Sequence, residues 1–265
     1  MFDYNRQLPL AIGEITVEYK NSAKVQDISY SSIDGGQIKA YLARPLGSGP
    51  FAGIIFVHPA PGDRSRFLDE AVTLASVGAI SLLINAPWAY PEFGERAAGM
   101  TAKDMRDMFV QTTKDVRRGV DLMLSQPDVD ASRVGYVGHS FGALLGGILS
   151  GVEKRIKAFV LMAGTGSFTD AAVLNMPGLE AEALEMYRQT MEPIDPVHYV
   201  AHAAPSSLFF QFGLQDSFYP RQKFLDYYEA GSEPKSIRWY EADHYRLNEV
   251  GRFDRVEWMG KQLGL

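Results

Sequence analysis

The chain has 265 residues, of which 46% are hydrophobic, and a formal net charge of −6. This length suits one α/β domain with an insertion, or two small domains. It contains no cysteine, which excludes a thiolate nucleophile, a disulfide scaffold and cysteine-based metal sites. It has no long basic run, no apolar stretch of membrane-spanning length and no apolar signal-peptide core in Met1–Leu10, so we expect a cytoplasmic protein with neither nucleic-acid nor membrane partners.

Short apolar runs separated by turns predict the strands. Residues 25–30 and 38–43 are partly polar and flank the turn Asp34-Gly35-Gly36, as in an antiparallel pair at the edge of a sheet. The later runs are almost continuously apolar, which is typical of strands buried on both faces of a parallel sheet. These runs are residues 54–57, 80–84, 134–137, 159–162 and 208–212.

Amphipathic segments fill the intervals between these strands. The longest, residues 101–124, begins with a Thr101/Asp104 capping pattern and carries apolar residues at helical spacing. The other predicted helices are residues 67–77, 144–149, 179–191, 223–230 and 252–263. Strands that alternate with helices predict an α/β fold, in which a mostly parallel sheet has helices on both faces. Sites in such sheets lie beyond the carboxyl ends of the strands.

The interval between the apolar runs at 159–162 and 208–212 is long and contains the amphipathic segment 179–191. A structureless loop of this length would be unusual in a compact domain. We therefore predict that residues 165–204 form a cap, inserted within a single domain that spans residues 1–265. An ordinary crossover helix with a long lead-in is the alternative.

The sequence VGYVGHSFGA contains a G-x-S-x-G motif between a predicted strand and a predicted helix. This context is typical of a nucleophile elbow, a sharp turn that exposes the serine hydroxyl. A Cβ at Gly138 or Gly142 would collide with neighbouring backbone, and Gly146 and Gly147 would let the helix lie close to the sheet. We predict that Ser140 is the nucleophile; a glycine-rich turn with an exposed serine is the alternative.

A serine hydroxyl needs a base to activate it. Of the five histidines, His244 ends the polar segment Trp239-Tyr240-Glu241-Ala242-Asp243-His244, which follows what should be the last strand of the sheet, so we predict that it is the base. His139 is expected to pack beside the elbow. His198 and His202 are four residues apart and could bind a metal, but they have no obvious acidic third ligand, so no metal site is predicted.

The base in turn needs an orienting carboxylate. Asp216 turns out of the carboxyl end of the apolar run 208–212, and we predict this role for it. Asp243 is a rival because it adjoins the histidine, although an adjacent side chain rarely reaches its neighbour's Nδ1 with good geometry. Asp170 and Asp195 are weaker rivals within the predicted cap.

Acyl transfer also needs N–H donors for the oxyanion. Phe141 begins the helix after Ser140, so its N–H is free at the positive end of the helix dipole. The loop His58-Pro59-Ala60-Pro61-Gly62 follows the run 54–57, and its prolines have no N–H. We therefore predict that Phe141 and Ala60 form the oxyanion hole. A rigid turn without catalytic role is the alternative for the loop.

Over nearly its whole length the chain resembles the α/β-hydrolase superfamily, with the closest likeness to dienelactone hydrolase-like and prolyl-oligopeptidase-like serine esterases. The segments that carry the resemblance are FVHPAPGDR, GHSFG, IDPVHYV, FGLQDSFYP and YEADHYRL. The order Ser140, Asp216, His244 is also the order of that superfamily. The resemblance implies a mostly parallel sheet of eight strands. Dienelactone hydrolases themselves use a cysteine nucleophile, which this chain lacks.

Together these residues predict a carboxylesterase-type serine hydrolase that acts on a small-molecule acyl ester and needs no cofactor. The expected substrate-binding residues are Trp88, Tyr90, Phe93, Met186, Tyr187, Phe218 and Tyr219, with Met176 and Met191 as further candidates in the cap. An amidase, lactonase or short-peptide hydrolase with the same triad is one alternative, and a non-catalytic small-molecule-binding protein of the same fold is another. A homo-oligomer is left open.

Overall fold

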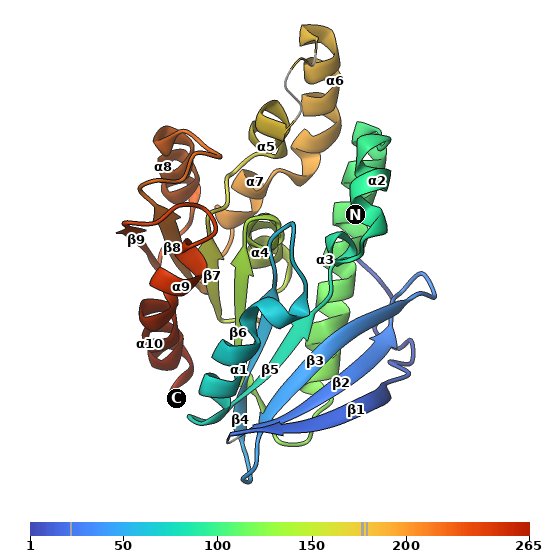
Figure 1. Cartoon of the computed structure of the whole chain (residues 1–265), viewed down its shortest axis with the longest axis vertical. Helices are drawn as coiled ribbons and strands as arrows, with labels where there is room; N and C mark the ends of the chain where they lie inside the picture. Colours follow the sequence, from blue (N-terminus) through green and yellow to red (C-terminus); the bar gives the residue numbers. More distant parts are fainter. Residues whose placement is uncertain (22, 176–177, 179) are drawn as a thin grey trace.

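The structure, a computed structural model, describes residues 1–21, 23–175, 178 and 180–265. Its described residues form one nine-stranded sheet in the order β1-β2-β3-β5-β4-β6-β7-β8-β9 (Figure 1). The strands are β1 (Gly13–Lys20), β2 (Ala23–Ser31), β3 (Gln37–Pro45), β4 (Phe51–Val57), β5 (Ala79–Ile84), β6 (Val129–His139), β7 (Ala158–Met162), β8 (Ser207–Gly213) and β9 (Lys235–Tyr240).

The α/β class and the mostly parallel sheet are confirmed, but the sheet has nine strands instead of eight. The strand that the sequence did not reveal is β1, which pairs antiparallel with β2. Its side chains are almost all exposed on both faces, so it carries no pattern of buried apolar residues. The β2–β3 pair is not the edge of the sheet, because β3 also pairs antiparallel with β5. From β5 to β9 all pairings are parallel.

Helices cover both faces of the sheet. The described helical segments are η1 (Arg64–Phe67), α1 (Leu68–Ala75), η2 (Pro87–Ala89), α2 (Glu92–Ala98), α3 (Ala102–Leu124), α4 (Phe141–Val152), α5 (Phe168–Asn175), α6 (Ala181–Met191), η3 (Glu192–Ile194), α7 (Pro196–Val200), α8 (Arg221–Ala230), α9 (Leu247–Val250) and α10 (Arg252–Leu263). Among the described residues, no helix combines the length and the apolar character that a membrane span requires.

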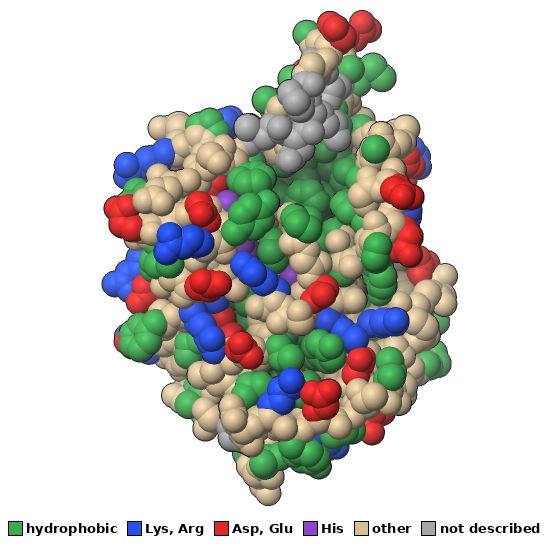
Figure 2. All heavy atoms as spheres, viewed as in Figure 1, with side chains coloured by type: hydrophobic (Ala, Val, Ile, Leu, Met, Phe, Trp, Pro, Cys, Tyr) green, Lys and Arg blue, Asp and Glu red, His purple; other side chains and the backbone are tan. Residues whose placement is uncertain are grey.

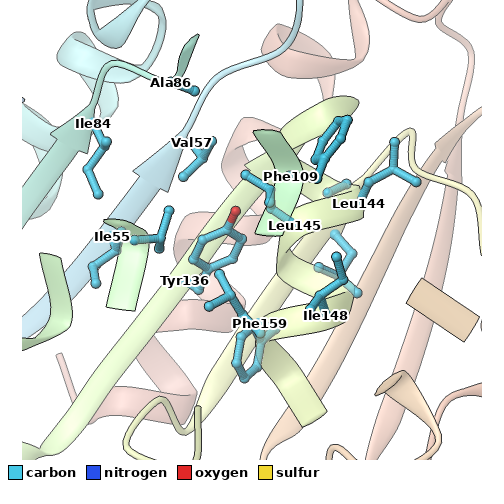
Figure 3. Packing of buried hydrophobic residues seen from close by; sticks show 14 of the residues in the cluster. Ile55, Val57, Ile84, Ala86, Phe109, Tyr136, Leu144, Leu145, Ile148 and Phe159 are labelled. Atoms are coloured by element: carbon cyan, nitrogen blue, oxygen red, sulfur yellow. The ribbon is translucent and has the colours of Figure 1, made fainter. Parts of the chain in front are cut away.

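Two buried clusters lie on opposite faces of the sheet. On one face, α3, α4 and α8 pack against the strands; Figure 3 shows Tyr136 and Phe159 of the sheet beside Leu145 and Ile148 of α4. On the other face, α1 and α10 contribute the second cluster. The predicted N-terminal capping of helix α3 is confirmed, since the side chains of Thr101 and Asp104 each bind the other residue's backbone N–H.

The segment predicted to form a cap contains α5, α6, η3 and α7. In Figure 1, α5 and α6 project beyond the body of the molecule on the side where the parallel strands end. Asp195 ties the two ends of the segment together, because its carboxylate accepts from the Phe168 N–H at 2.7 Å and from the Ser167 hydroxyl at 3.0 Å. Two of the sequence-predicted positions, Met176 and Leu179, lie outside the described residues.

A buried ion pair joins α1 and α10. The Nε of Arg255 donates to Glu70 Oε1 at 2.9 Å, and its Nη2 donates to Glu70 Oε2 and to the Asn248 carbonyl, the latter at 2.7 Å. Both charged side chains are almost fully buried. A buried carboxylate that lost this partner would keep its desolvation penalty without compensation.

We expect Arg255→Met to lower the free energy of unfolding by about 3–5 kcal/mol, because it leaves Glu70 buried and unpaired. Lys261→Met is the matched control: it lies on the same helix, and its ion pair with Glu257 is exposed, so it should change stability little. Urea denaturation of both variants measures the difference. A loss in Arg255→Met no larger than in the control would contradict this account.

Candidate active site

Ser140 occupies a strained turn between β6 and α4. Its φ of 55° and ψ of −116° lie in a region that a non-glycine residue rarely adopts, and such strain is concentrated at functional sites. A Cβ added to Gly142 would lie 2.2 Å from the Val57 carbonyl oxygen, and one added to Gly138 would lie 2.2 Å from the Gly142 carbonyl oxygen. The predicted reason for these two glycines is therefore confirmed.

The two glycines that follow have different neighbours. A Cβ at Gly146 would lie 2.5 Å from Cε1 of Tyr136 in β6, so this glycine does allow α4 to approach the sheet. A Cβ at Gly147 would instead meet the Tyr227 hydroxyl of α8 at 2.0 Å and the Pro196 Cβ of α7 at 2.7 Å. The prediction that both glycines face the sheet is thus wrong for Gly147, which allows close packing of helices.

Asp216 and His244 are in direct contact. The Nδ1 of His244 lies 2.7 Å from Oδ2 of Asp216, and the two side chains are 3% and 0% exposed. The other carboxylate oxygen of Asp216 accepts from the Phe218 N–H at 2.8 Å. With the carboxylate ionised, Nδ1 is the donor, which leaves Nε2 of His244 free to accept a proton.

The rival carboxylates are engaged elsewhere. Asp243 accepts hydrogen bonds from backbone N–H groups of its own loop. Asp170 forms an ion pair with Lys223 at 3.0 Å, and Asp195 binds the backbone of Phe168. Of the four candidates, the structure therefore brings only Asp216 to the imidazole.

Residues next to Ser140 and Asp216 connect the serine turn to the His244–Asp216 pair. The Nε2–H of His139 donates to the His244 carbonyl at 2.9 Å. The ring of Phe218 lies 4.2 Å from the ring of His244, centroid to centroid, and Phe218 lines the same cavity as Ser140. Within the described part of the chain the Ser140 hydroxyl makes no hydrogen bond. Nucleophile–base hydrogen bonds are often long without substrate and tighten when it binds.

His139 has a role that the sequence did not reveal. It is fully buried, and burial, followed by the proximity of His244, holds the pKa of His139 far below its usual value. The His139 ring is therefore neutral, and its Nε2–H holds the backbone of the loop that carries His244. Because the acceptor is a backbone carbonyl from a remote loop, no local sequence pattern indicates this contact.

The residues that carry the two predicted oxyanion donors line the same cavity. Phe141 and Ala60 both line it together with Ser140, and α4 begins at Phe141. Among the described residues, neither backbone N–H donates to a protein acceptor. A pair of unused N–H groups, one of them at the positive end of a helix, can stabilise a developing negative charge.

His58 fixes the loop that carries Ala60. Its Nδ1–H donates to the Pro59 carbonyl at 2.8 Å, while its Nε2 accepts from the Ala86 N–H at 3.1 Å. The indole N–H of Trp88 donates to the His58 carbonyl at 3.1 Å. Burial lowers the pKa of His58 to about 4, so the ring stays neutral and can both donate and accept. The sequence indicated only the backbone of this loop, not the bridging side chain.

A cavity of about 850 Å³ adjoins Ser140. Figure 2 shows hydrophobic side chains gathered in a hollow below the projecting cap. Six of the predicted wall residues line the cavity, namely Trp88, Tyr90, Phe93, Tyr187, Phe218 and Tyr219. The structure does not bring Met186 to it, since this side chain is 64% exposed, and Met191 is buried away from the lining. Among the described residues, no lysine, arginine or histidine lines the cavity.

Comparison with known proteins finds one matching family and several structures with a similar fold. Residues 117–206 match the family described as "BAAT / Acyl-CoA thioester hydrolase C terminal". An acetyl xylan esterase from Paenibacillus sp. R4 is similar with a TM-score of 0.80 and 20% identity, over 97% of this chain and 90% of that one. The predicted resemblance to the α/β-hydrolase superfamily is confirmed, and the chain has the α/β-hydrolase fold.

Two further structures share the fold. Acetyl xylan esterase 1 from Thermoanaerobacterium sp. JW/SL YS485 has a TM-score of 0.72 and 18% identity, over 90% of this chain and 84% of that one. The 2,6-dihydroxy-pseudo-oxynicotine hydrolase has a TM-score of 0.70 and 16% identity, over 91% of this chain and 68% of that one. None of the curated proteins matches the sequence significantly.

The lowered pKa of His58 makes stability depend on pH. An ordinary histidine in the unfolded chain takes up a proton near pH 6.5, whereas folded His58 does so only near pH 4. Between these values the unfolded state binds one more proton. The contribution of neutral His58 to stability is therefore present above pH 6.5 and is lost as the pH falls toward 4.

We expect the difference in free energy of unfolding between the wild type and His58→Gln to fall by roughly 2 kcal/mol from pH 7 to pH 5. Chemical denaturation at both pH values measures it. Burial raises the pKa of Asp115 to about 6, so this group makes the free energy of unfolding fall as the pH rises, opposite to His58. Because Asp115 is present in both proteins, its effect cancels in the difference between them. His202→Gln, at an exposed histidine, is the control. Equal pH slopes for wild type and His58→Gln would refute the assignment.

Proposed function

We propose that this protein is a serine hydrolase that cleaves carboxylic esters through an acyl-enzyme intermediate. The observation that carries the proposal is the 2.7 Å contact between His244 and Asp216 beside a strained serine turn. The matched family description and the esterase names of the similar structures support hydrolysis of an ester or thioester bond. Residues 165–204 would act as the cap over the site, in a single domain of residues 1–265.

The proposed cycle uses each group at a defined step. His244 takes the proton of Ser140 as the hydroxyl oxygen attacks the acyl carbonyl, and Asp216 stabilises the imidazolium that forms. The N–H groups of Phe141 and Ala60 bind the tetrahedral oxyanion. His244 then protonates the departing alcohol, and a water molecule, deprotonated by His244, hydrolyses the acyl-enzyme.

We expect Ser140→Ala to lower turnover of p-nitrophenyl butyrate by about a million-fold, because the members of a triad act as a unit. A fluorophosphonate probe should label the wild type and leave Ser140→Ala unlabelled, as identified by mass spectrometry of the modified peptide. Ser76→Ala, at an exposed serine outside the site, serves as the control. Stoichiometric ligand binding without turnover or labelling would instead support the non-catalytic alternative.

A thioester hydrolase is the second candidate, because the family match covers the elbow and the whole predicted cap. Coenzyme A carries phosphates that require cationic or N–H partners, yet no cation lines the described part of the cavity. The same triad could also act on amides, lactones or short peptides. The acyl group alone does not separate these functions, so the leaving group must be varied.

We expect kcat/KM for butyryl-CoA to be no higher than for butyryl-N-acetylcysteamine, which has the same thioester but no phosphates. Both should be compared with p-nitrophenyl butyrate and with the matched anilide. A preference for the CoA ester of about tenfold or more would show recognition of the CoA moiety and would favour the second candidate. Faster hydrolysis of the anilide than of the ester would favour an amidase.

A further inference from the structure

Two tyrosines give the cavity a polar patch. Tyr187 belongs to α6 and Tyr219 follows β8; both line the cavity, and they are 8% and 5% exposed. Among the described residues, neither phenol oxygen makes a hydrogen bond. The Tyr136 hydroxyl, by contrast, donates to the Gly142 carbonyl at 2.6 Å. The Tyr187 and Tyr219 oxygens are not among the fully enclosed side-chain atoms without a partner, so each keeps access to the cavity and can donate to a ligand there.

The charges around these phenols restrict what they can bind. Burial is the main cause that raises the pKa of Tyr219, and Asp216, Asp170 and Tyr187 raise it further. Burial and then Asp195 raise the pKa of Tyr187 to about 12. Both phenols thus keep their protons and can donate. The nearby Asp170 and Asp216 are each already paired, with Lys223 and His244 respectively. Because no cation lines the described part of the cavity, an anionic group would find no counter-charge there, and an uncharged acceptor is favoured.

The other polar groups of the lining are already engaged or exposed. The indole N–H of Trp88 donates to the His58 carbonyl, and the Asp63 carboxylate accepts from Ser65. The side chain of Tyr90 is 37% exposed and can be hydrated. Apart from Ser140 itself, the buried side-chain donors that remain among the described lining residues are the hydroxyls of Tyr187 and Tyr219.

We propose that Tyr187 and Tyr219 donate hydrogen bonds to an uncharged oxygen of the substrate. The substrate would be an ester with an apolar or aromatic body and a second oxygen function, such as a ketone, ether or second ester. This inference rests on the proposed ester hydrolysis at Ser140. A site built to bind such an oxygen discriminates against the analogue that lacks it, because its own polar groups would then stay buried and unpaired.

Matched esters test this selectivity. One pair is p-nitrophenyl levulinate and p-nitrophenyl pentanoate, and a longer pair is the p-nitrophenyl esters of acetylphenyl-propanoic and isopropylphenyl-propanoic acid. The wild type should prefer the keto ester in at least one pair. Tyr187→Phe and Tyr219→Phe, which remove only the hydroxyls, should each lower the ratio of kcat/KM for keto over plain ester by about two- to tenfold.

Tyr228→Phe is the matched control. Its ring belongs to α8, does not line the cavity and packs against Phe210, so the ratio should stay unchanged. A ratio that also stays unchanged in both cavity variants, with activity retained, would overturn the proposal. So would a wild type that shows no preference for the keto ester in either pair.

A binding measurement separates this proposal from the proposed function. In the Ser140→Ala background, benzylacetone and isopentylbenzene can be titrated by quenching of tryptophan fluorescence, since Trp88 lines the cavity. Either tyrosine variant should weaken ketone binding by about two- to tenfold and leave the hydrocarbon unaffected. If ketone binding is weakened in this way but the wild type hydrolyses no ester, the proposed esterase function is refuted and the proposed tyrosine site is retained. Equal affinities in all variants would refute the tyrosine site alone.

Discussion

The close approach of α4 to the end of β4 is the constraint on which the site depends. Only a residue without Cβ fits at Gly142, because the Val57 carbonyl lies where that atom would be. The Tyr136 hydroxyl donates to the Gly142 carbonyl at 2.6 Å and fixes the first turn of the helix. The helix N-terminus is therefore held against the loop that follows β4, and Phe141 and Ala60 line one cavity as a result.

Three buried histidines surround this point, and their environments give them different tasks. His58 and His139 use their ring nitrogens to hold backbone groups, and burial keeps both rings neutral. His244 alone has a carboxylate against its Nδ1. Among the described residues, Nε2 of His244 makes no hydrogen bond, so of these three rings His244 combines a carboxylate partner at Nδ1 with an unused Nε2.

The sequence was most informative where the responsible interactions are local. The capping pattern at Thr101 and the close approach of Gly138 to the Gly142 carbonyl depend on residues within a few positions, and the structure confirms both. Gly142 is required by the remote Val57 carbonyl, and the G-x-S-x-G motif indicated it only because the motif is typical of this turn. The sequence was not informative about β1, whose exposed side chains follow no burial pattern. The ring contacts of His58 and His139 depend on backbone atoms from other loops, so residue type alone could not indicate them.

Residues 186 and 187 illustrate a second limit. Met186 and Tyr187 lie on one apolar stripe of the amphipathic segment 179–191 by helical spacing, and both are predicted to bind substrate. In the structure α6 projects from the body (Figure 1), and of the two residues only Tyr187 lines the cavity. The tertiary position of the helix, which local periodicity does not encode, decides which side of the stripe is covered. Of this adjacent pair, Tyr187 therefore lines the cavity and Met186 does not.

The proposed chemistry and the cavity wall depend on different parts of the fold. Ser140, Asp216 and His244 follow the ends of β6, β8 and β9, which are held by the parallel sheet. Part of the wall comes instead from α2, which has no buried residue, and from α6, which buries only Tyr187 and Met191. Substitutions in these helices disturb few core contacts, so the wall can be reshaped while the sheet keeps the reactive groups in place. The proposed substrate selectivity is thus separable from the proposed catalytic geometry, because the Tyr187 hydroxyl lies on a helix that makes few core contacts.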